Sequence, residues 1–299
     1  MLEKFVGSKN TVENITLALK SQRLANSILV CAEDGLGRGY FARLLAADYL
    51  YPMGGNGAVA VENGNGAEVI NVLGEGASGQ ISAKRIREVR SAVCETSLSS
   101  TGRVVIIKNA HMMNQSSANA LLKILEEPPE GVLFILCAKN AMSVMATIRS
   151  RCGIFSLCAP SIAQCEEYLS GFSKDLKNVH ILANVFGGNI GVCKSCLTDK
   201  KRMNVFVVAQ SLVENLALKN SYGVQCVLAK YEKEKEELLQ VLTDACQIIV
   251  ASVNDKTQNL PQMEIAYGAK MATELQNTIF ALKQNANTKL ALCAFATQI

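Results

Sequence analysis

A glycine-rich turn, Gly35-Leu36-Gly37-Arg38-Gly39, separates a short apolar run from a longer amphipathic segment. Such a turn at the start of a helix presents backbone N–H groups and the positive helix end, which together bind phosphate. A working nucleotide loop has the pattern GxxxxGK[ST], whose Lys reaches the phosphates and whose hydroxyl binds Mg²⁺. Here Ala32 replaces the first glycine, Arg38 the lysine and Gly39 the hydroxyl residue. We interpret the turn as a vestigial phosphate loop acting as a strand-to-helix connection, with residual nucleotide binding as the alternative.

The acidic half of a hydrolytic site is also missing. In a phosphate-loop NTPase, a carboxylate after a buried strand helps to hold Mg²⁺, and a further group orients the attacking water. The apolar run at residues 104–107 is followed instead by Lys108 and Asn109. Because both losses affect the metal, we expect no intrinsic ATP hydrolysis and no productively bound ATP or magnesium.

The cysteines and histidines do not predict a metal site. The chain has 11 cysteines, an odd number without a framework spacing, and only two histidines, His111 and His180. Cys193 and Cys196 form a single CxxC pair without a second pair nearby. We interpret both as packing residues; a redox or metal role is the alternative. The sequence therefore predicts no bound metal.

The elements that would position these residues alternate between strand and helix. Apolar runs with almost no polar alternation are typical of strands covered by helices on both faces. We predict strands at residues 27–31, 68–73, 104–107, 132–137 and 154–157, and helices at 38–50, 82–98 and 114–127. Pro128-Pro129 ends the last of these helices. The pattern predicts a parallel α/β sheet.

The rest of the chain is predicted to be a loop, a linker and helices. Residues 52–66 are rich in Gly and Asn, so we predict a surface loop or insertion there and no helix or strand. Helical stretches are expected at 161–172, 177–187 and 189–199, a linker at 197–202, and helices throughout from residue 203.

Composition limits the function classes. Hydrophobic residues at 49% and charged residues at 19% exclude a disordered chain. A net charge of +4 is too small for a surface that grips nucleic acid by charge alone. The sequence has neither a membrane-spanning apolar run nor a secretory signal, so we expect a cytoplasmic protein without a membrane partner.

Four segments carry a family resemblance: Phe5-Val6-Gly7, Gly35-Leu36-Gly37, residues 118–129 with the sequence ANALLKILEEPP, and residues 147–152 with the sequence TIRSRC. They resemble the clamp-loader branch of the AAA+ family. The resemblance covers essentially the whole chain and is strongest over residues 104–155. Because its phosphate loop is altered and residues 104–107 are not followed by carboxylates, the chain is similar to a non-hydrolysing subunit of that branch.

The resemblance implies three parts: an AAA+ α/β domain at residues 1–159, a helical lid at 160–202 and an oligomerising helical collar at 203–299. It further implies that Arg151 of the Ser150-Arg151-Cys152 motif acts in trans on ATP held by a neighbouring subunit. The implied partners are the gamma or tau ATPase subunits and the delta subunit of the DNA polymerase III holoenzyme, and, through the complex, the sliding clamp and primed DNA. An active, ATP-driven motor subunit of the same ring is the runner-up.

Departures from the family pattern support the non-hydrolysing reading. Residues 51–67 lack the cysteines of the zinc module that many relatives carry, so no zinc is expected. Gly191-Val192 stand where active relatives have a sensing arginine. A basic cluster, Lys84-Arg85 with Arg87 and Arg90, is interpreted as a solvated helix face, with a DNA phosphate contact as the alternative.

Overall fold

The chain forms two compact units. The computed structural model describes residues 1–76, 78–94, 102–254 and 260–299. The first unit is Met1–Pro160 and the second is Ser161–Ile299. One hydrophobic core, from Cys165 to Phe295, runs through the second unit. The further division of this unit into a lid and a collar stays a prediction.

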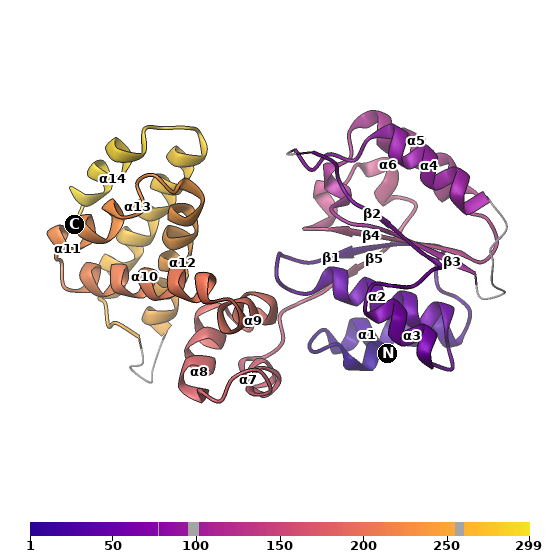
Figure 1. The fold of residues 1–299 in the computed structure, drawn as a ribbon, viewed down its shortest axis with the longest axis horizontal. Helices are drawn as coiled ribbons and strands as arrows, with labels where there is room; N and C mark the ends of the chain where they lie inside the picture. Colours follow the sequence, from indigo (N-terminus) through magenta and orange to yellow (C-terminus); the bar gives the residue numbers. More distant parts are fainter. Residues whose placement is uncertain (77, 95–101, 255–259) are drawn as a thin grey trace. The chain divides into compact units, whose positions relative to one another are not determined.

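The first unit is built on a five-stranded sheet in which every pairing is parallel (Figure 1). The strand order is β2-β3-β4-β1-β5. The strands are β1 (Ser27–Cys31), β2 (Val69–Val72), β3 (Arg103–Ile107), β4 (Val132–Ala138) and β5 (Gly153–Ser156). The predicted α/β fold is thus confirmed, and the loops after β1, β3 and β4 share the carboxyl edge of the sheet.

Helices cover both faces of this sheet because successive strand residues point to opposite sides. In β1, Ile28 and Val30 join the core beneath α1, α2 and α3, whereas Leu29 and Cys31 join the core beneath α4, α5 and α6 (Figure 1). The helices of this unit are η1 (Leu2–Lys4), α1 (Lys9–Lys20), α2 (Arg38–Leu50), α3 (Asn56–Glu62), α4 (Ala83–Cys94), η2 (Ala110–Met112), α5 (Gln115–Glu126), η3 (Ala141–Ser143) and α6 (Ala146–Arg149). Residues 95–98 of the predicted helix at 82–98 lie outside the described residues.

The prediction of a plain loop at residues 52–66 is wrong. Helix α3 occupies the middle of this segment and buries Ala58 and Val61 completely or nearly so. At Gly57 an added Cβ would come 2.5 Å from the Tyr51 ring, so the missing side chain lets α3 pack closely. Tertiary burial therefore outweighs the low helix propensity of glycine and asparagine.

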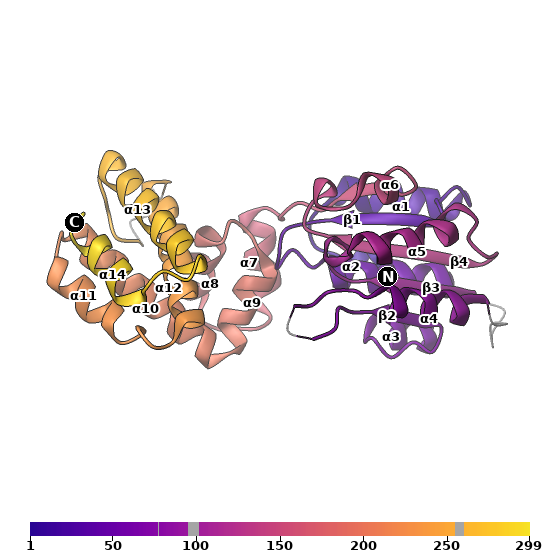
Figure 2. The ribbon, with the colours of Figure 1, turned by 90° about the horizontal axis from the view of Figure 1, so that it is seen from above.

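The second unit is entirely helical over its described residues. Its helices are α7 (Ile162–Ser170), α8 (Leu176–Val185), α9 (Ile190–Thr198), α10 (Lys200–Ala217), α11 (Ser221–Ala229), α12 (Lys235–Asn254), α13 (Ile265–Lys283) and α14 (Thr288–Ala296). α12 packs against both α10 and α13 (Figures 1 and 2). Six helices start at a side chain that accepts a backbone N–H: Ser161, Asp175, Asn189, Asp199, Asn220 and Asn287.

The predicted linker at residues 197–202 is also wrong. Only Asp199 separates α9 from α10, where it ends one helix and caps the next. Two cations of this segment, Lys201 and Arg202, form ion pairs with Glu237 and Asp244 of α12, so the segment is part of the helical packing and not a spacer. Within the described ranges, no helix combines the length and apolar character needed to cross a bilayer.

Candidate functional site

The vestigial phosphate loop connects β1 to α2. Gly35 and Gly37 adopt left-handed backbone angles, with φ of +87° and +76°. Gly37 precedes the first residue of α2, and a Cβ added to it would lie 3.3 Å from the Phe5 ring. At Gly39 an added Cβ would meet nothing within 4 Å. Gly37 is therefore required by backbone conformation and packing, whereas Gly39 leaves room for a side chain.

Arg38, at the lysine position of the loop, forms hydrogen bonds with residues of the loops around it. Its Nη1 donates to the carbonyl oxygen of Ala32 at 2.5 Å. Its Nη2 donates to Asp34 Oδ1 at 2.7 Å and to Asn109 Oδ1 at 3.2 Å. Only 12% of the side chain is exposed. The guanidinium thus bridges the loops after β1 and β3 and is not extended toward a ligand.

Asp34 supplies a carboxylate between two cations of this loop region. Lys139, directly after β4, places Nζ 2.6 Å from Asp34 Oδ2, opposite the contact with Arg38. Burial raises the pKa of Asp34, but the hydrogen bonds and charges of Lys139 and Arg38 outweigh it and bring the pKa below its usual value. The carboxylate therefore stays ionised near neutral pH. Sequence reasoning missed both Asp34 and Lys139, although a lysine directly after an apolar strand was a usable signal.

The positions after β3 carry no carboxylate. The backbone N–H of Lys108 donates to the Val72 carbonyl, continuing the sheet. Asn109 has a left-handed φ of +53° and uses its side-chain oxygen to accept from Arg38. Burial lowers the pKa of the nearby His111, and the charges of Arg38 and Lys139 lower it further, so this imidazole is neutral at pH 7. The structure therefore joins Asn109 to the loop through Arg38, and among the described residues the loop cations Arg38 and Lys139 both pair with the Asp34 carboxylate.

Arg151 lies in the turn after α6 and contacts Glu126 at the end of α5. Its Nε and Nη2 donate to Glu126 Oε1 at 2.8 and 2.5 Å. Its Nη1 donates to the Thr147 carbonyl at 2.9 Å and to Ser150 Oγ at 3.3 Å. About a third of the Arg151 side chain, 35%, remains exposed. Cys152 packs against the core beneath α4 and α5, and burial raises its pKa to about 11.

The phosphate loop and the Ser-Arg-Cys turn are two separate sites of the first unit. Among the described residues, no hydrogen bond or ion pair connects Arg151 with Arg38 or with the other residues of the loop. Arg151 therefore does not act on a ligand of its own loop through any contact seen here. An action on another subunit stays a prediction.

The basic cluster on α4 is mainly solvated. Lys84, Arg87 and Arg90 are exposed. Arg85 is held by Glu88 at 3.2 Å and by the Asn71 carbonyl at 3.4 Å. This exposure supports a solvated helix face. A contact of these three cations with DNA phosphates stays an untested alternative.

The CxxC cysteines are core residues. Cys193 and Cys196 lie on α9 with 0% and 1% of their surface exposed, and Cys193 Sγ contacts the Leu182 carbonyl at 3.4 Å. Burial raises the pKa of Cys196 to about 11. Across the described part of the chain, no three His, Cys, Asp or Glu side chains are grouped to hold a metal. These observations support packing as their role.

Thiol labelling tests this assignment. Among the cysteines whose exposure the structure describes, maleimide added to the native chain at pH 7 is expected to modify the three exposed ones first: Cys158, Cys226 and Cys293. Four others are expected to react only after unfolding, because burial raises their pKa to about 11 or 12: Cys137, Cys152, Cys196 and Cys246. Peptide mass spectrometry with a denatured control reads the result. Fast native labelling of Cys193 or Cys196 would contradict a packing role.

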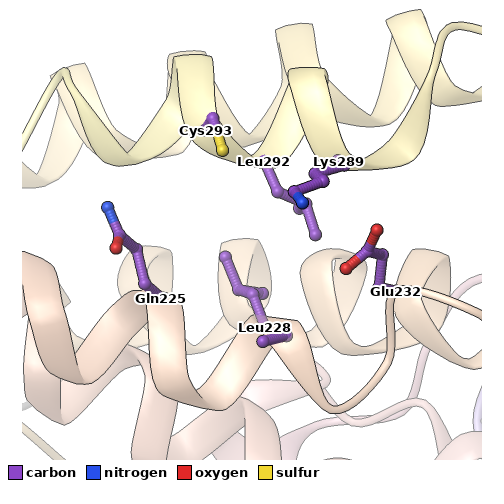
Figure 3. A pocket seen from close by; sticks show the side chains of 7 residues that line it. Gln225, Leu228, Glu232, Lys289, Leu292 and Cys293 are labelled. Atoms are coloured by element: carbon purple, nitrogen blue, oxygen red, sulfur yellow. The ribbon is translucent and has the colours of Figure 1, made fainter.

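A small pocket of about 160 Å³ lies between α11 and α14 in the second unit. Leu228 and Leu292 point into it from the two sides, and Glu232 and Lys289 lie at one end (Figure 3). Its lining is mainly apolar. Glu232, Lys289 and Cys293 line it, but among the described residues no hydrogen bond or ion pair joins these three side chains, so we assign the pocket no catalytic role.

The parallel sheet, the glycine-rich turn after β1, the helices on both faces and the helical second unit define an AAA+-type P-loop fold. A solved structure of a DNA polymerase III gamma subunit-related protein from Thermotoga maritima superposes with a TM-score of 0.57. The match covers 95% of this chain and 97% of that one at 18% identity, which is a likeness of fold alone. The model of the family described as "DNA polymerase III, delta subunit" matches residues 7–161. The chain belongs to this family.

Two curated relatives come from Haemophilus influenzae. The tau/gamma subunit of DNA polymerase III is 28% identical over 254 residues, which are 79% of this chain and 36% of that protein. The delta' subunit of DNA polymerase III is 33% identical over 102 residues, or 34% of this chain and 31% of that protein. The chain thus spans about a third of the length of each relative.

Proposed function

We propose that the chain is a non-hydrolysing clamp-loader subunit of the delta-prime type. In this proposal it assembles in the cytoplasm with gamma or tau ATPase subunits and a delta subunit of DNA polymerase III. The complex loads the sliding clamp onto primed DNA, and Arg151 completes the ATP site of a neighbouring subunit. The observation that carries the proposal is the internal pairing of Arg38 in a loop without the residues that bind Mg²⁺.

Arg38 already uses three of its five N–H donors within the loop region. Its two terminal nitrogens donate to Ala32, Asp34 and Asn109. A phosphate beside Arg38 would compete with the Asp34 carboxylate, which is held by a second cation, Lys139. Even then, Gly39 supplies no hydroxyl for the metal. Phosphoryl transfer depends on a positioned metal and fixed positive charge, so this loop lacks its main catalytic parts.

The chemistry of Arg151 and the family of the chain support the proposed role of this residue. A guanidinium is planar and permanently charged, and it presents paired N–H donors to phosphate oxygens. Arg151 is partly exposed, and its Nη1 is held by the Thr147 carbonyl of α6. An arginine so placed is suited to a nucleotide on another chain. No zinc, magnesium or nucleotide bound to this chain enters the proposal.

A second candidate function, an ATP-driven motor subunit of the gamma or tau type, is favoured by one observation. The match to the tau/gamma relative extends over 254 residues, whereas the match to the delta' relative extends over 102. The altered loop and the residues after β3 count against it. ATP turnover by the purified chain separates the two candidates.

The purified chain, mixed with the ATPase and delta subunits from the same source, is expected to co-elute with them in gel filtration. Alone it is expected to release no phosphate from ATP. The double substitution Arg38→Lys with Gly39→Ser rebuilds part of the loop pattern but is expected to restore no turnover, because Lys108 and Asn109 still supply no carboxylate. The ATPase subunit assayed in parallel is the positive control. Turnover by the wild-type chain within about tenfold of that control would favour the motor function.

A further inference from the structure

We propose that Glu126 is a positioning residue that orients Arg151 before the neighbouring subunit's ATP arrives. This inference rests on the proposed in-trans role of Arg151. Glu126 itself touches no nucleotide in this account. It acts through the hydrogen bonds that it accepts from the guanidinium.

Glu126 lies at a rigid point of the fold. It is the last residue of α5, which buries Leu121, Ile124 and Leu125 in the core on one face of the sheet. Pro128-Pro129 prevent the helix from continuing, so the carboxylate stays at the helix end. Arg151, by contrast, belongs to a turn. The pairing therefore anchors a turn residue to a well-packed helix.

The contacts of Arg151 account for four of its five N–H donors. The Nε–H and one Nη2–H point to Glu126 Oε1, and Nη1 serves the Thr147 carbonyl and Ser150 Oγ. One Nη2–H is left to extend toward a ligand. A long, partly exposed side chain with this many bonds has lost much of its rotamer freedom in advance. Such preorganisation raises the rate of a reaction that needs one fixed geometry.

In this proposal Glu126 orients Arg151 through its acceptor oxygen and not through its negative charge. A carboxylate beside the guanidinium offsets part of the positive charge that a γ-phosphate would use. The amide of Glu126→Gln keeps an acceptor oxygen in the same place, whereas Glu126→Ala removes it. Glu127 is a matched control, because it is exposed and its side chain forms no ion pair or hydrogen bond with any described residue.

The experiment measures ATP turnover by the complex reconstituted from full-length chains, stimulated by clamp and primed DNA. Glu126→Ala is expected to lower kcat about three- to tenfold with the KM for ATP little changed. Glu126→Gln is expected to retain at least about half of the wild-type kcat, since the acceptor remains. Glu127→Ala is expected to match wild type. If the Glu126→Ala chain fails to assemble, Glu126→Asp replaces it. This substitution withdraws the carboxylate by one methylene and is also expected to lower kcat.

NMR of the free chain supplies a readout that turnover does not. The Arg151 Nε–H resonance, identified by its loss in Arg151→Lys, is expected to shift and to exchange faster with water in Glu126→Ala. It is expected to stay near its wild-type position in Glu127→Ala.

The outcomes separate this inference from the proposed function. If Arg151→Ala leaves turnover unchanged, the in-trans function fails. If Arg151→Ala lowers turnover but Glu126→Ala and Glu126→Asp do not, the positioning role is overturned and the in-trans function stands. A rise in turnover with Glu126→Ala and Glu126→Gln also overturns it, because Glu126 would then restrain the arginine by charge.

Discussion

Replacing Arg151 by alanine is expected to lower the clamp- and DNA-stimulated ATP turnover of the reconstituted complex at least about tenfold, and up to the 10³-fold or more that arginine fingers contribute elsewhere. The physical reason is the loss of a fixed guanidinium beside the charge that develops on the γ-phosphate. Assembly is expected to persist, because Arg151 contacts only its own turn and Glu126 within the described chain. Phosphate release and gel filtration measure the two effects.

Two further variants test whether the guanidinium of Arg151 itself causes this loss of turnover. Arg151→Lys keeps a positive charge but loses the paired planar donors, so most of the loss is expected to remain. Arg149→Ala is a matched control, because Arg149 lies two residues away and donates to Ala141 and Met142 of its own loop region. Equal turnover of wild type and Arg151→Ala in a fully assembled complex would contradict the in-trans role.

Replacing Asp244 by alanine is expected to destabilise the helical unit by about 3–5 kcal/mol, the usual cost of leaving a buried charge without its partner. Asp244 is 1% exposed and pairs with both terminal nitrogens of Arg202, at 2.5 and 2.9 Å. Gln240 donates to the same carboxylate at 2.9 Å. The pair joins α10 to α12, so its loss weakens the packing of two core helices. Urea unfolding followed by circular dichroism measures the change.

A less buried pair between the same helices provides the control. Lys201 and Glu237 also connect α10 with α12, but 73% and 24% of their side chains are exposed, against 14% and 1% for Arg202 and Asp244. Glu237→Ala is expected to leave the unfolding midpoint nearly unchanged, since surface ion pairs contribute little. The double variant Arg202→Met with Asp244→Leu is expected to recover much of the stability lost in Asp244→Ala, because neither charge is then left buried alone. Equal effects of Asp244→Ala and Glu237→Ala would contradict the buried-pair account.

The centre of the sheet was predictable because β1, β3 and β4 are buried on both faces and are therefore apolar along nearly their whole length. The turn after β1 was predictable because Gly35 and Gly37 need backbone conformations that other residues rarely adopt. Lys108 and Asn109 follow β3 at the carboxyl edge of the sheet, where the carboxyl ends of parallel strands meet; their role as a degenerate acidic site stays a prediction. These features depend on local sequence and on a simple rule of topology.

The pairings within the sites were not predictable. Arg38 bonds to Asn109, and Arg151 bonds to Glu126, across long separations in the chain. A sequence read one segment at a time gives the charge of each residue but not its partner. For the same reason the sequence predicted Arg202 to lie in a linker. It lies in α10 and pairs with the carboxylate of Asp244 in α12. Tertiary packing decides these contacts.

Partner ATPase subunits inactivated at their own phosphate-loop lysine show whether this chain hydrolyses ATP itself. The complex is assembled from these subunits, the delta subunit and the wild-type chain, and ATP turnover is measured with clamp and primed DNA. Turnover is expected to fall to background, because this chain contributes an arginine but no hydrolytic site of its own. Residual turnover that scales with the amount of this chain would contradict the account and identify the chain as an active ATPase.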